Sequence, residues 1–333
     1  MKASSVYIIA EAGVNHNGSL DLAKELVKAA AEIGADAIKF QTFKAENIVT
    51  KSAQRADYQN ENCADTDSQY EMIKKLELSD EEFKTLLQHS KDLKIDFLSS
   101  PFDLTSIDFL HGIGMDVFKV PSGEITNLPY LRLLAAKAKE VILSTGMSTI
   151  DEVRDALAVL ENSNISKITL LHATTEYPCP PDEVNLLAMK SLHQKFNLDV
   201  GYSDHTQGIE IPIAAAALGA KVIEKHFTLD NSMQGPDHRA SLNVEDFSSM
   251  VNAVRLIERA LGDGEKAPTS SELRNIPIVR KSIVAKKRIE IGEVFSSENI
   301  TTKRPGSGLN PMKNWDSILG TVSKKSYDAD ELI

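Results

Sequence analysis

The sequence predicts an α/β protein in which a (β/α)8 TIM barrel is followed by a small β-rich domain. Eight short apolar runs of strand character recur along the first part of the chain, and a segment of helical character follows each run. Eight such units fit a closed parallel barrel in both length and order. An open doubly wound sheet is the alternative, but it usually has fewer strands, and no GxGxxG turn follows the first run. The predicted strands are residues 6–12, 37–42, 96–102, 117–122, 141–146, 168–174, 199–205 and 221–228.

A change of composition predicts where the barrel ends. Residues 262–277 are rich in Gly, Pro, Ser and charged side chains, which is typical of a linker. Residues 278–333 contain short β-type runs separated by Gly and polar turns. The sequence therefore predicts a catalytic barrel at 1–261, a linker at 262–277 and a small β-rich domain at 278–333. Because so short a domain rarely has a sufficient core of its own, we expect it to dock on the barrel or on a partner.

Composition and charge exclude several classes of function. The 333 residues include 37 Lys and Arg against 48 Asp and Glu, and the net charge of −11 argues against a surface for nucleic acid or an anionic membrane. No stretch approaches the roughly 20 apolar residues of a membrane span, and the start of the chain lacks the apolar run of a secretory signal. We therefore expect a cytoplasmic protein. The two cysteines, Cys63 and Cys179, have no zinc-site or disulfide spacing and are predicted to be free thiols.

Two histidines stand at the ends of neighbouring predicted strands. His205 ends the run at 199–205, His226 lies near the end of the run at 221–228, and a helical stretch at 209–220 separates the two runs. A right-handed crossover of this length places the two strands side by side and parallel, about 4.8 Å apart. Two imidazoles in these positions are able to share one metal ion. The alternative is that each histidine only makes hydrogen bonds within its own strand end.

Polar side chains gather where the predicted strands end, which is where barrel enzymes place their chemistry. Two lysines beside several hydroxyls suit a phosphate with an adjoining carboxylate, because ammonium and hydroxyl donors replace the water that an anion loses. The alternative is that both lysines are structural and pair with Glu11, Glu124 or Glu224. Asp237, in the turn at 235–241, is expected to overhang the mouth and bond sugar hydroxyls. The candidates at the strand ends are Glu11, Lys39, Gln41, Ser100, Lys119, Ser122, Glu124, Ser144, Thr175, Tyr177 and Ser203.

Ten strings along the chain, in order, resemble the bacterial sialic acid synthase family, the N-acetylneuraminate synthases and their legionaminic acid and pseudaminic acid relatives. The resemblance covers essentially the whole chain. It implies a TIM barrel followed by an antifreeze-like (SAF) domain, in a homodimer whose SAF domains are swapped. It also implies that phosphoenolpyruvate condenses with an N-acylated mannosamine-type sugar and that phosphate is released. The strings are IAEAGVNHNGS, IKFQTFKA, FLSSPFD, FKVPSGEITNLP, ILSTGM, TEYPCP, GYSDHT, IEKHFTLD, GPDHRAS and TTKRPGSGL.

The same resemblance implies a role for each candidate residue. His205 and His226 would hold a divalent ion, usually Mn²⁺, with Mg²⁺ or Co²⁺ as substitutes. Glu11 matches the residue that handles a proton or the attacking water, and Lys39 and Lys119 complete the catalytic set. The implied phosphoenolpyruvate ligands are Lys39, Ser100, Lys119, Ser122, Ser144, Thr175 and Ser203. The implied sugar ligands are Gln41, Glu124, Tyr177, Asp237 and, from the partner's SAF domain, Arg304.

This chain departs from the family pattern at two of these positions. Ser100 stands where many members have threonine, and both residues offer a hydroxyl. Thr175 stands where the better-known members carry asparagine, which weakens the transfer of a phosphoenolpyruvate-binding role to it.

The resemblance predicts N-acetylneuraminate synthase, with N-acetylmannosamine as the acceptor. The alternative is N,N'-diacetyllegionaminate synthase, which performs the same chemistry on 2,4-diacetamido-2,4,6-trideoxymannose. A hypothesis from another class is a catalytically silent sugar-binding or ice-binding protein, but the complete set of lysines, histidines and glutamates at the mouth argues against it. A metal-dependent aldolase acting on pyruvate would need no phosphate-binding residues.

Overall fold

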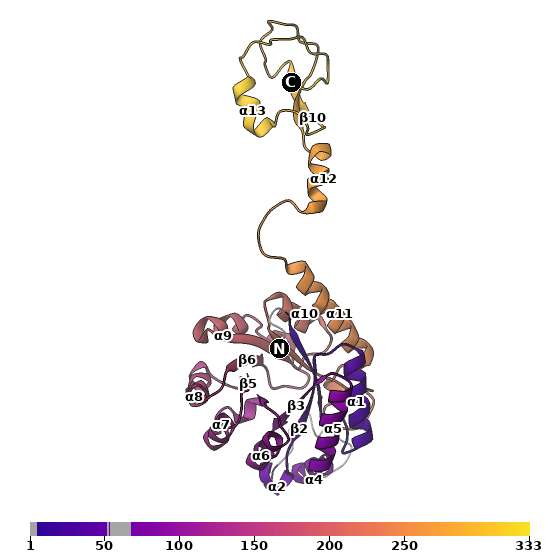
Figure 1. Ribbon diagram of the computed structural model, residues 1–333, viewed down its shortest axis with the longest axis vertical. Helices are drawn as coiled ribbons and strands as arrows, with labels where there is room; N and C mark the ends of the chain where they lie inside the picture. The colour runs from indigo at the N-terminus through magenta and orange to yellow at the C-terminus, as the bar shows by residue number, and fades with distance from the viewer. Residues whose placement is uncertain (1–4, 52, 54–67) are drawn as a thin grey trace. The chain divides into compact units, whose positions relative to one another are not determined.

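The computed structural model describes residues 5–51, 53 and 68–333, and it divides into two compact units that separate after Gly262. In the first unit, eight parallel strands pair in the order β3-β2-β1-β8-β7-β6-β5-β4. Strands β3 and β4 also pack side by side, so the sheet closes into the predicted TIM barrel (Figure 1). The strands are β1 (Tyr7–Gly13), β2 (Ala37–Thr42), β3 (Asp96–Pro101), β4 (Val117–Val120), β5 (Glu140–Ser144), β6 (Lys167–Ala173), β7 (Asp199–Asp204) and β8 (Val222–His226).

Helices lie around the outside of this barrel (Figure 1). Side-chain caps start several of them: Ser19 accepts a hydrogen bond from the amide of Leu22, and Ser79 and Glu82 form a capping box at the start of α5. The helices of the first unit are α1 (Leu20–Glu32), α2 (Ala45–Ile48), α4 (Gln69–Lys75), α5 (Asp80–Asp92), α6 (Leu104–Gly112), α7 (Leu128–Ala135), α8 (Ile150–Glu161), α9 (Ala188–Phe196), α10 (Glu210–Ala217) and α11 (Val244–Leu261).

The inward faces of the strands change from apolar to polar along the barrel. A small inner cluster that includes Tyr7, Ile9 and Val222 fills the barrel toward the amino ends of the strands. Successive side chains of a strand point to opposite faces. Glu11 lies two positions after Ile9, and Glu224 lies two positions after Val222. Both glutamates are therefore directed inward, but they carry charge. This alternation places the charged candidates at the carboxyl-end mouth of the barrel.

The second unit begins at Asp263 and has an apolar core of its own. Its elements are α12 (Ser270–Val279), β9 (Ser282–Ala285), β10 (Ile300–Lys303) and α13 (Pro311–Ile318). Strands β9 and β10 are antiparallel, and Ile283, Phe295 and Ile300 are buried beneath Trp315. The stretch predicted as a linker contains most of α12, which starts with a capping box formed by Thr269 and Glu272. In the part of the chain that is described, no helix is both long and apolar enough to cross a membrane.

Candidate active site

A buried cluster of four charged side chains occupies the barrel mouth. Lys39 Nζ lies 2.7 Å from Glu11 Oε2 and 3.6 Å from Glu224 Oε2, and Lys119 Nζ lies 3.1 Å from Glu224 Oε1. All four side chains are less than a tenth exposed. Strands β1 and β2 pair Glu11 with Lys39, so the sheet register itself creates the first ion pair. Both lysines therefore contact carboxylates, as the structural alternative required, but neither pairs with Glu124.

The four charged groups of this cluster differ in the direction in which their pKa values are shifted. Burial raises the pKa of Glu11, and Lys39 only partly opposes that rise. Burial alone would lower the pKa of Lys39, but Glu11 and Glu224 outweigh it and the pKa is raised. Burial lowers the pKa of Lys119, which Glu224 offsets only in part. Burial would raise the pKa of Glu224, but Lys119 and Lys39 hold it below its usual value. Lys119 is thus the cation whose charge would gain most from an added anion.

Several hydroxyls and a backbone amide converge beside this cluster. Ser122 Oγ accepts a hydrogen bond of 3.0 Å from the amide of Gly146. A Cβ at Gly146 would lie 2.6 Å from Thr175 Oγ1 and 2.8 Å from Ser122 Oγ, so only glycine leaves this space open. Ser144 Oγ is buried and has no hydrogen-bond partner among the described residues. Such a group is expected where a polar ligand completes the bonding.

The two remaining serines of the predicted set already have partners within the cluster. Lys39 Nζ donates to Ser100 Oγ at 3.1 Å, and Ser203 Oγ donates to Glu224 Oε1 at 2.8 Å. These bonds fix the lysine and the glutamate in place. The structure therefore brings all the predicted phosphoenolpyruvate ligands to one mouth, where some hydroxyls are engaged and Ser144 is not.

His205 and His226 lie side by side as predicted, with ring centroids 5.7 Å apart. The backbone oxygen of Thr174 lies 2.5 Å from His205 Nδ1 and can only accept, so Nδ1 carries the proton and Nε2 keeps a free lone pair. Within the described residues His226 Nδ1 is buried and has no hydrogen-bond partner. Burial lowers the pKa of His205 to about 4 and holds that of His226 well below its ordinary value, so both imidazoles are neutral.

These two rings fit a metal site of a particular kind. Neutral imidazoles are good ligands for divalent transition metals. In such sites the ring nitrogen that does not bind the metal usually donates its hydrogen to a carboxylate, a backbone carbonyl or water. Among the described residues no group of three or more His, Cys, Asp or Glu side chains is arranged around a common metal position.

A second buried ion pair supports the histidine-bearing strands from outside. Lys225 Nζ contacts Asp204 Oδ2 and donates to the backbone oxygen of Thr206 at 2.6 Å. Asp204 Oδ1 in turn accepts from the amide and hydroxyl of Thr206. Because Asp204 and Lys225 directly precede His205 and His226 and are fully buried, this pair fixes the ends of β7 and β8 relative to each other.

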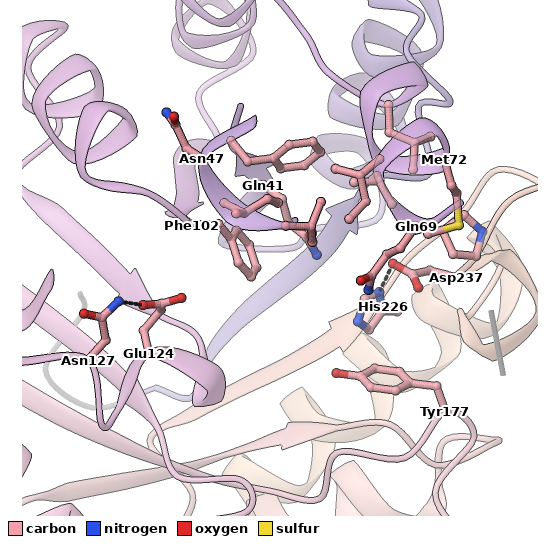
Figure 2. A pocket seen from close by; sticks show the side chains of 17 residues that line it. Gln41, Asn47, Gln69, Met72, Phe102, Glu124, Asn127, Tyr177, His226 and Asp237 are labelled. Atoms are coloured by element: carbon pink, nitrogen blue, oxygen red, sulfur yellow. Dashed lines mark hydrogen bonds and ion pairs between the residues drawn. The ribbon is translucent and has the colours of Figure 1, made fainter. Parts of the chain in front are cut away.

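The four predicted sugar ligands of the barrel, Gln41, Glu124, Tyr177 and Asp237, line a cavity of about 480 Å³ at the mouth (Figure 2). Gln41 Nε2 donates to Glu11 Oε1 at 3.2 Å, and the Tyr177 ring lies 4.2 Å from the His205 ring between centroids. Glu124 follows β4 and accepts a bond of 2.6 Å from Asn127. Asp237 Oδ2 lies 3.8 Å from His226 Nδ1, and burial raises the pKa of this carboxyl to about 7.

One predicted sugar ligand belongs to the second unit, and one predicted free cysteine falls outside the described residues. Arg304 belongs to the second unit, is exposed, and donates from Nε to the backbone oxygen of Val279 at 3.0 Å. Its role in a partner's sugar site stays a prediction. Cys179 is free and buried, and Cys63 lies outside the described residues.

Glu224 belongs to the site although the motifs assign it no catalytic or binding role. The sequence predicts it at a strand end and as a structural partner of the lysines, and it contacts both of them and Ser203. The signal was present in the sequence, because Glu224 stands two positions before His226 and so shares its inward face. Asn127 has no comparable signal, since it reaches Glu124 from the start of α7.

A barrel mouth with two lysines, two carboxylates and two neutral histidines defines an enzyme site for an anionic substrate. Comparison with known proteins gives the family: the NeuB family matches residues 26–266 and the SAF domain matches residues 280–333. The chain belongs to the NeuB family, and it is an enzyme of the transferase class. The resemblance found from its motifs is thereby confirmed.

Relatives of known name are similar over almost the whole chain. The N,N'-diacetyllegionaminic acid synthase of Campylobacter jejuni is 54% identical and covers 98% of this chain and 98% of its own. That of Legionella pneumophila is 49% identical over 92% of this chain and 87% of its own. A crystal structure of N-acetylneuraminic acid synthetase from Leptospira borgpetersenii with citrate has a TM-score of 0.72 at 34% identity, covering 82% of this chain and 90% of that one.

Proposed function

We propose that this enzyme condenses phosphoenolpyruvate with an N-acylated mannosamine-type sugar and releases phosphate, in the manner of a sialic acid synthase. The observation that supports this function most directly is the combination of Lys39 and Lys119 with the unpartnered hydroxyl of Ser144 in one buried mouth. An aldolase acting on pyruvate would have no use for this many phosphate donors. A silent sugar-binding protein would not need buried charges that lower stability.

The chain's own residues account for binding and for the movement of protons. Lys39 and Lys119 would hold the phosphate and carboxylate of phosphoenolpyruvate and stabilise the departing phosphate anion. Carbon 3 of phosphoenolpyruvate bonds to the aldehyde carbon of the open-chain sugar, water adds at carbon 2, and the carbon–oxygen bond to phosphate then breaks. The raised pKa of Glu11 suits it to take the proton that the attacking water loses and to pass it to the oxygen of the former aldehyde. The remaining hydroxyl proton at carbon 2 leaves with the phosphate as the carbonyl forms.

A divalent ion, with Mn²⁺ as the first candidate and Mg²⁺ or Co²⁺ as substitutes, would be held by His205 and His226. When bound, it would act as a Lewis acid that polarises the sugar aldehyde. The neutral state of both rings and the fixed tautomer of His205 support this assignment.

N-acetylmannosamine, which would give N-acetylneuraminate, is the acceptor that the sequence motifs predict. The alternative acceptor, 2,4-diacetamido-2,4,6-trideoxymannose, is favoured by one specific observation: the relatives at 54% and 49% identity are both named N,N'-diacetyllegionaminic acid synthases. Both acceptors present an aldehyde and an acetamido group to the same site, so the reaction class does not depend on the choice.

Phosphate release by the full chain, measured with phosphoenolpyruvate and each acceptor in turn, tests the function. We expect release only when both substrates are present, loss of release in a chelator, and recovery with manganese. His205→Ala and His226→Ala should abolish both activity and bound manganese, counted by elemental analysis. His193→Ala, an exposed histidine on α9, is the matched control and should change neither. Full activity in metal-free protein would contradict the metal assignment.

We also propose a homodimer in which each SAF domain lends Arg304 to the sugar site of its partner. The support is the family resemblance and the exposed position of Arg304 in a separately folded unit. Mixing inactive Arg304→Ala and His205→Ala subunits should restore part of the activity, because one site of a mixed dimer keeps both groups. A mixture that stays inactive after confirmed subunit exchange would contradict the exchange of arginine between subunits.

A further inference from the structure

The cavity at the mouth has two chemically different sides. The polar part of its lining includes His226 and four predicted sugar ligands, Gln41, Glu124, Tyr177 and Asp237 (Figure 2). Its other side is a hydrophobic cluster separate from the barrel core, which we call the apolar wall. The apolar wall consists of Val14, Phe43, Ile48, Ile73, Leu76 and Phe102.

The apolar wall is built from segments that extend beyond the strands. Val14 follows β1, Phe43 follows β2, and Phe102 follows β3, where the two phenylalanine rings meet edge to face with centroids 6.5 Å apart. Ile48 and Ile73 come from the short helices α2 and α4, which the barrel fold itself does not require. Val14 and Phe43 are buried, whereas Ile48, Ile73 and Phe102 keep part of their surface exposed. That remaining apolar surface is what a bound ligand would cover.

We infer that the apolar wall receives the end of the sugar remote from its aldehyde, and that it selects an acceptor ending in a methyl group over one ending in a hydroxymethyl group. This inference rests on the proposed function. The reacting aldehyde must lie near the histidines, so the other end of the sugar extends into the rest of the same cavity. A methyl group gains free energy when it leaves water for an apolar surface. A hydroxyl placed there loses its hydrogen bonds to water without replacement.

One further polar group of the cavity lining offers the competing outcome. Gln69, the first residue of α4, also lines the cavity, whereas the amide of Asn47 already donates to Thr105 Oγ1 at 3.2 Å. If Gln69 bound a terminal hydroxyl, the enzyme would prefer the hydroxymethyl sugar. A preference for the methyl sugar would therefore support the apolar wall, and a preference for the hydroxymethyl sugar would support Gln69.

The test compares N-acetylmannosamine with its 6-deoxy analogue, two sugars that differ by a single hydroxyl. We expect kcat/KM to favour the 6-deoxy sugar by about 10- to 100-fold, the discrimination usual for one small group in an apolar pocket. Equal values, or a preference for N-acetylmannosamine, would overturn the inference. Affinities of both sugars for the enzyme, measured by calorimetry, should follow the same order. If neither sugar releases phosphate, turnover of 2,4-diacetamido-2,4,6-trideoxymannose decides the proposed function, while the affinity ratio still decides the role of the wall.

Variants locate the preference on the apolar wall. Val14→Thr keeps the shape of the side chain and adds a hydroxyl to the wall, so it should reduce the preference several-fold. Val153→Thr is the matched control, because Val153 is equally buried but lies in α8, outside the cavity. If Val14→Thr folds poorly, Ile73→Thr provides the same test at a half-buried position. The inference would be overturned if the ratio of kcat/KM for the two sugars changed no more in either wall variant than in Val153→Thr.

Discussion

The two units of this chain differ in whether they bury ion pairs. The barrel has surface pairs, such as Lys139 with Asp116, but it also buries pairs at the mouth, where Lys39 with Glu11 and Lys119 with Glu224 are almost without exposure. The second unit keeps its pairs on the surface, where Arg288 contacts both Glu290 and Asp328 with all three side chains mostly exposed. All eight histidines of the chain also belong to the barrel unit, and the second unit has none.

This difference distinguishes charges that serve a ligand from charges that serve solubility. A surface pair exchanges solvation by water for a weak and screened attraction, so it contributes little to stability. A buried cluster loses solvation that its internal attractions hardly repay. The cluster at the mouth is therefore best explained by the ligand that it binds, and its cost to stability should be measurable.

Removing Glu224 should have the largest effect. Glu224→Ala leaves Lys119 without a carboxylate and Lys39 with only one, and the loss of one partner from a buried pair costs about 3–5 kcal/mol in the free energy of unfolding. Glu290→Ala makes the same change on the surface of the second unit and should leave the unfolding midpoint unchanged. Urea denaturation of both variants measures the contrast. If Glu224→Ala and Glu290→Ala lowered the free energy of unfolding equally, the burial of an ion pair would not determine its contribution to stability.

Acid should destabilise the barrel unit before the second unit. Burial lowers the pKa of both His16 and His238 to about 4, below the ordinary value of 6.5 in an unfolded chain. The unfolded state therefore binds protons more readily, and stability is lost as the pH falls from 6.5 toward 4. At 1.4 kcal/mol per pKa unit, each histidine contributes a loss of about 3 kcal/mol once the pH is below 4.

The single tryptophan makes this difference observable in the full chain. Trp315 packs on the core of the second unit, so its fluorescence reports that unit, whereas far-ultraviolet circular dichroism mainly reports the barrel helices. The barrel transition should move to lower urea between pH 6.5 and 5, and the fluorescence transition should move less. Replacing His16 and His238 by Gln should flatten the barrel's dependence on pH. An unchanged slope in that double variant would assign the acid sensitivity to other groups.

The architecture was readable from the sequence because its signals are local and repeated. Each of the eight predicted strands is found within two residues of its expected bounds, since apolar runs and the caps at Ser19 and Ser79 depend on neighbours in the chain. Helix α12 was hidden by the Ser, Pro and charge of its surroundings, although the Thr269–Glu272 capping box was a valid signal.

The candidate site was only partly readable. Residues on the strands, such as Lys39 and His226, follow from alternation and from parallel register. The apolar wall could not be predicted, because Val14, Phe43 and Phe102 come together only when three loops and two short helices converge. The engagement of Ser203 by Glu224 likewise depends on the pairing of β7 with β8 in this register.

Lys119→Ala should weaken phosphoenolpyruvate binding by a moderate amount. Burial lowers the pKa of Lys119, so its charge is incompletely balanced until an anion binds. A hydrogen bond to a charged group is worth about 1.5–3 kcal/mol, which corresponds to an increase in KM for phosphoenolpyruvate of about 10- to 150-fold. The KM for the sugar should change far less. Lys325→Ala, which removes an exposed lysine paired with Glu331, is the matched control. Equal effects on both substrates would make Lys119 structural.

The smallest effect should come from Ser144, whose buried hydroxyl at the mouth has no hydrogen-bond partner among the described residues. Ser144→Ala removes no hydrogen bond among the described residues, so the free energy of unfolding should stay the same or rise slightly. A neutral hydrogen bond to a ligand contributes about 0.5–1.5 kcal/mol, so KM for phosphoenolpyruvate should rise about 2- to 13-fold. Ser203→Ala is the matched control, because it breaks the bond to Glu224 and should lower stability as well. If Ser144→Ala destabilised the fold and left KM unchanged, the hydroxyl would serve the barrel and not the phosphate.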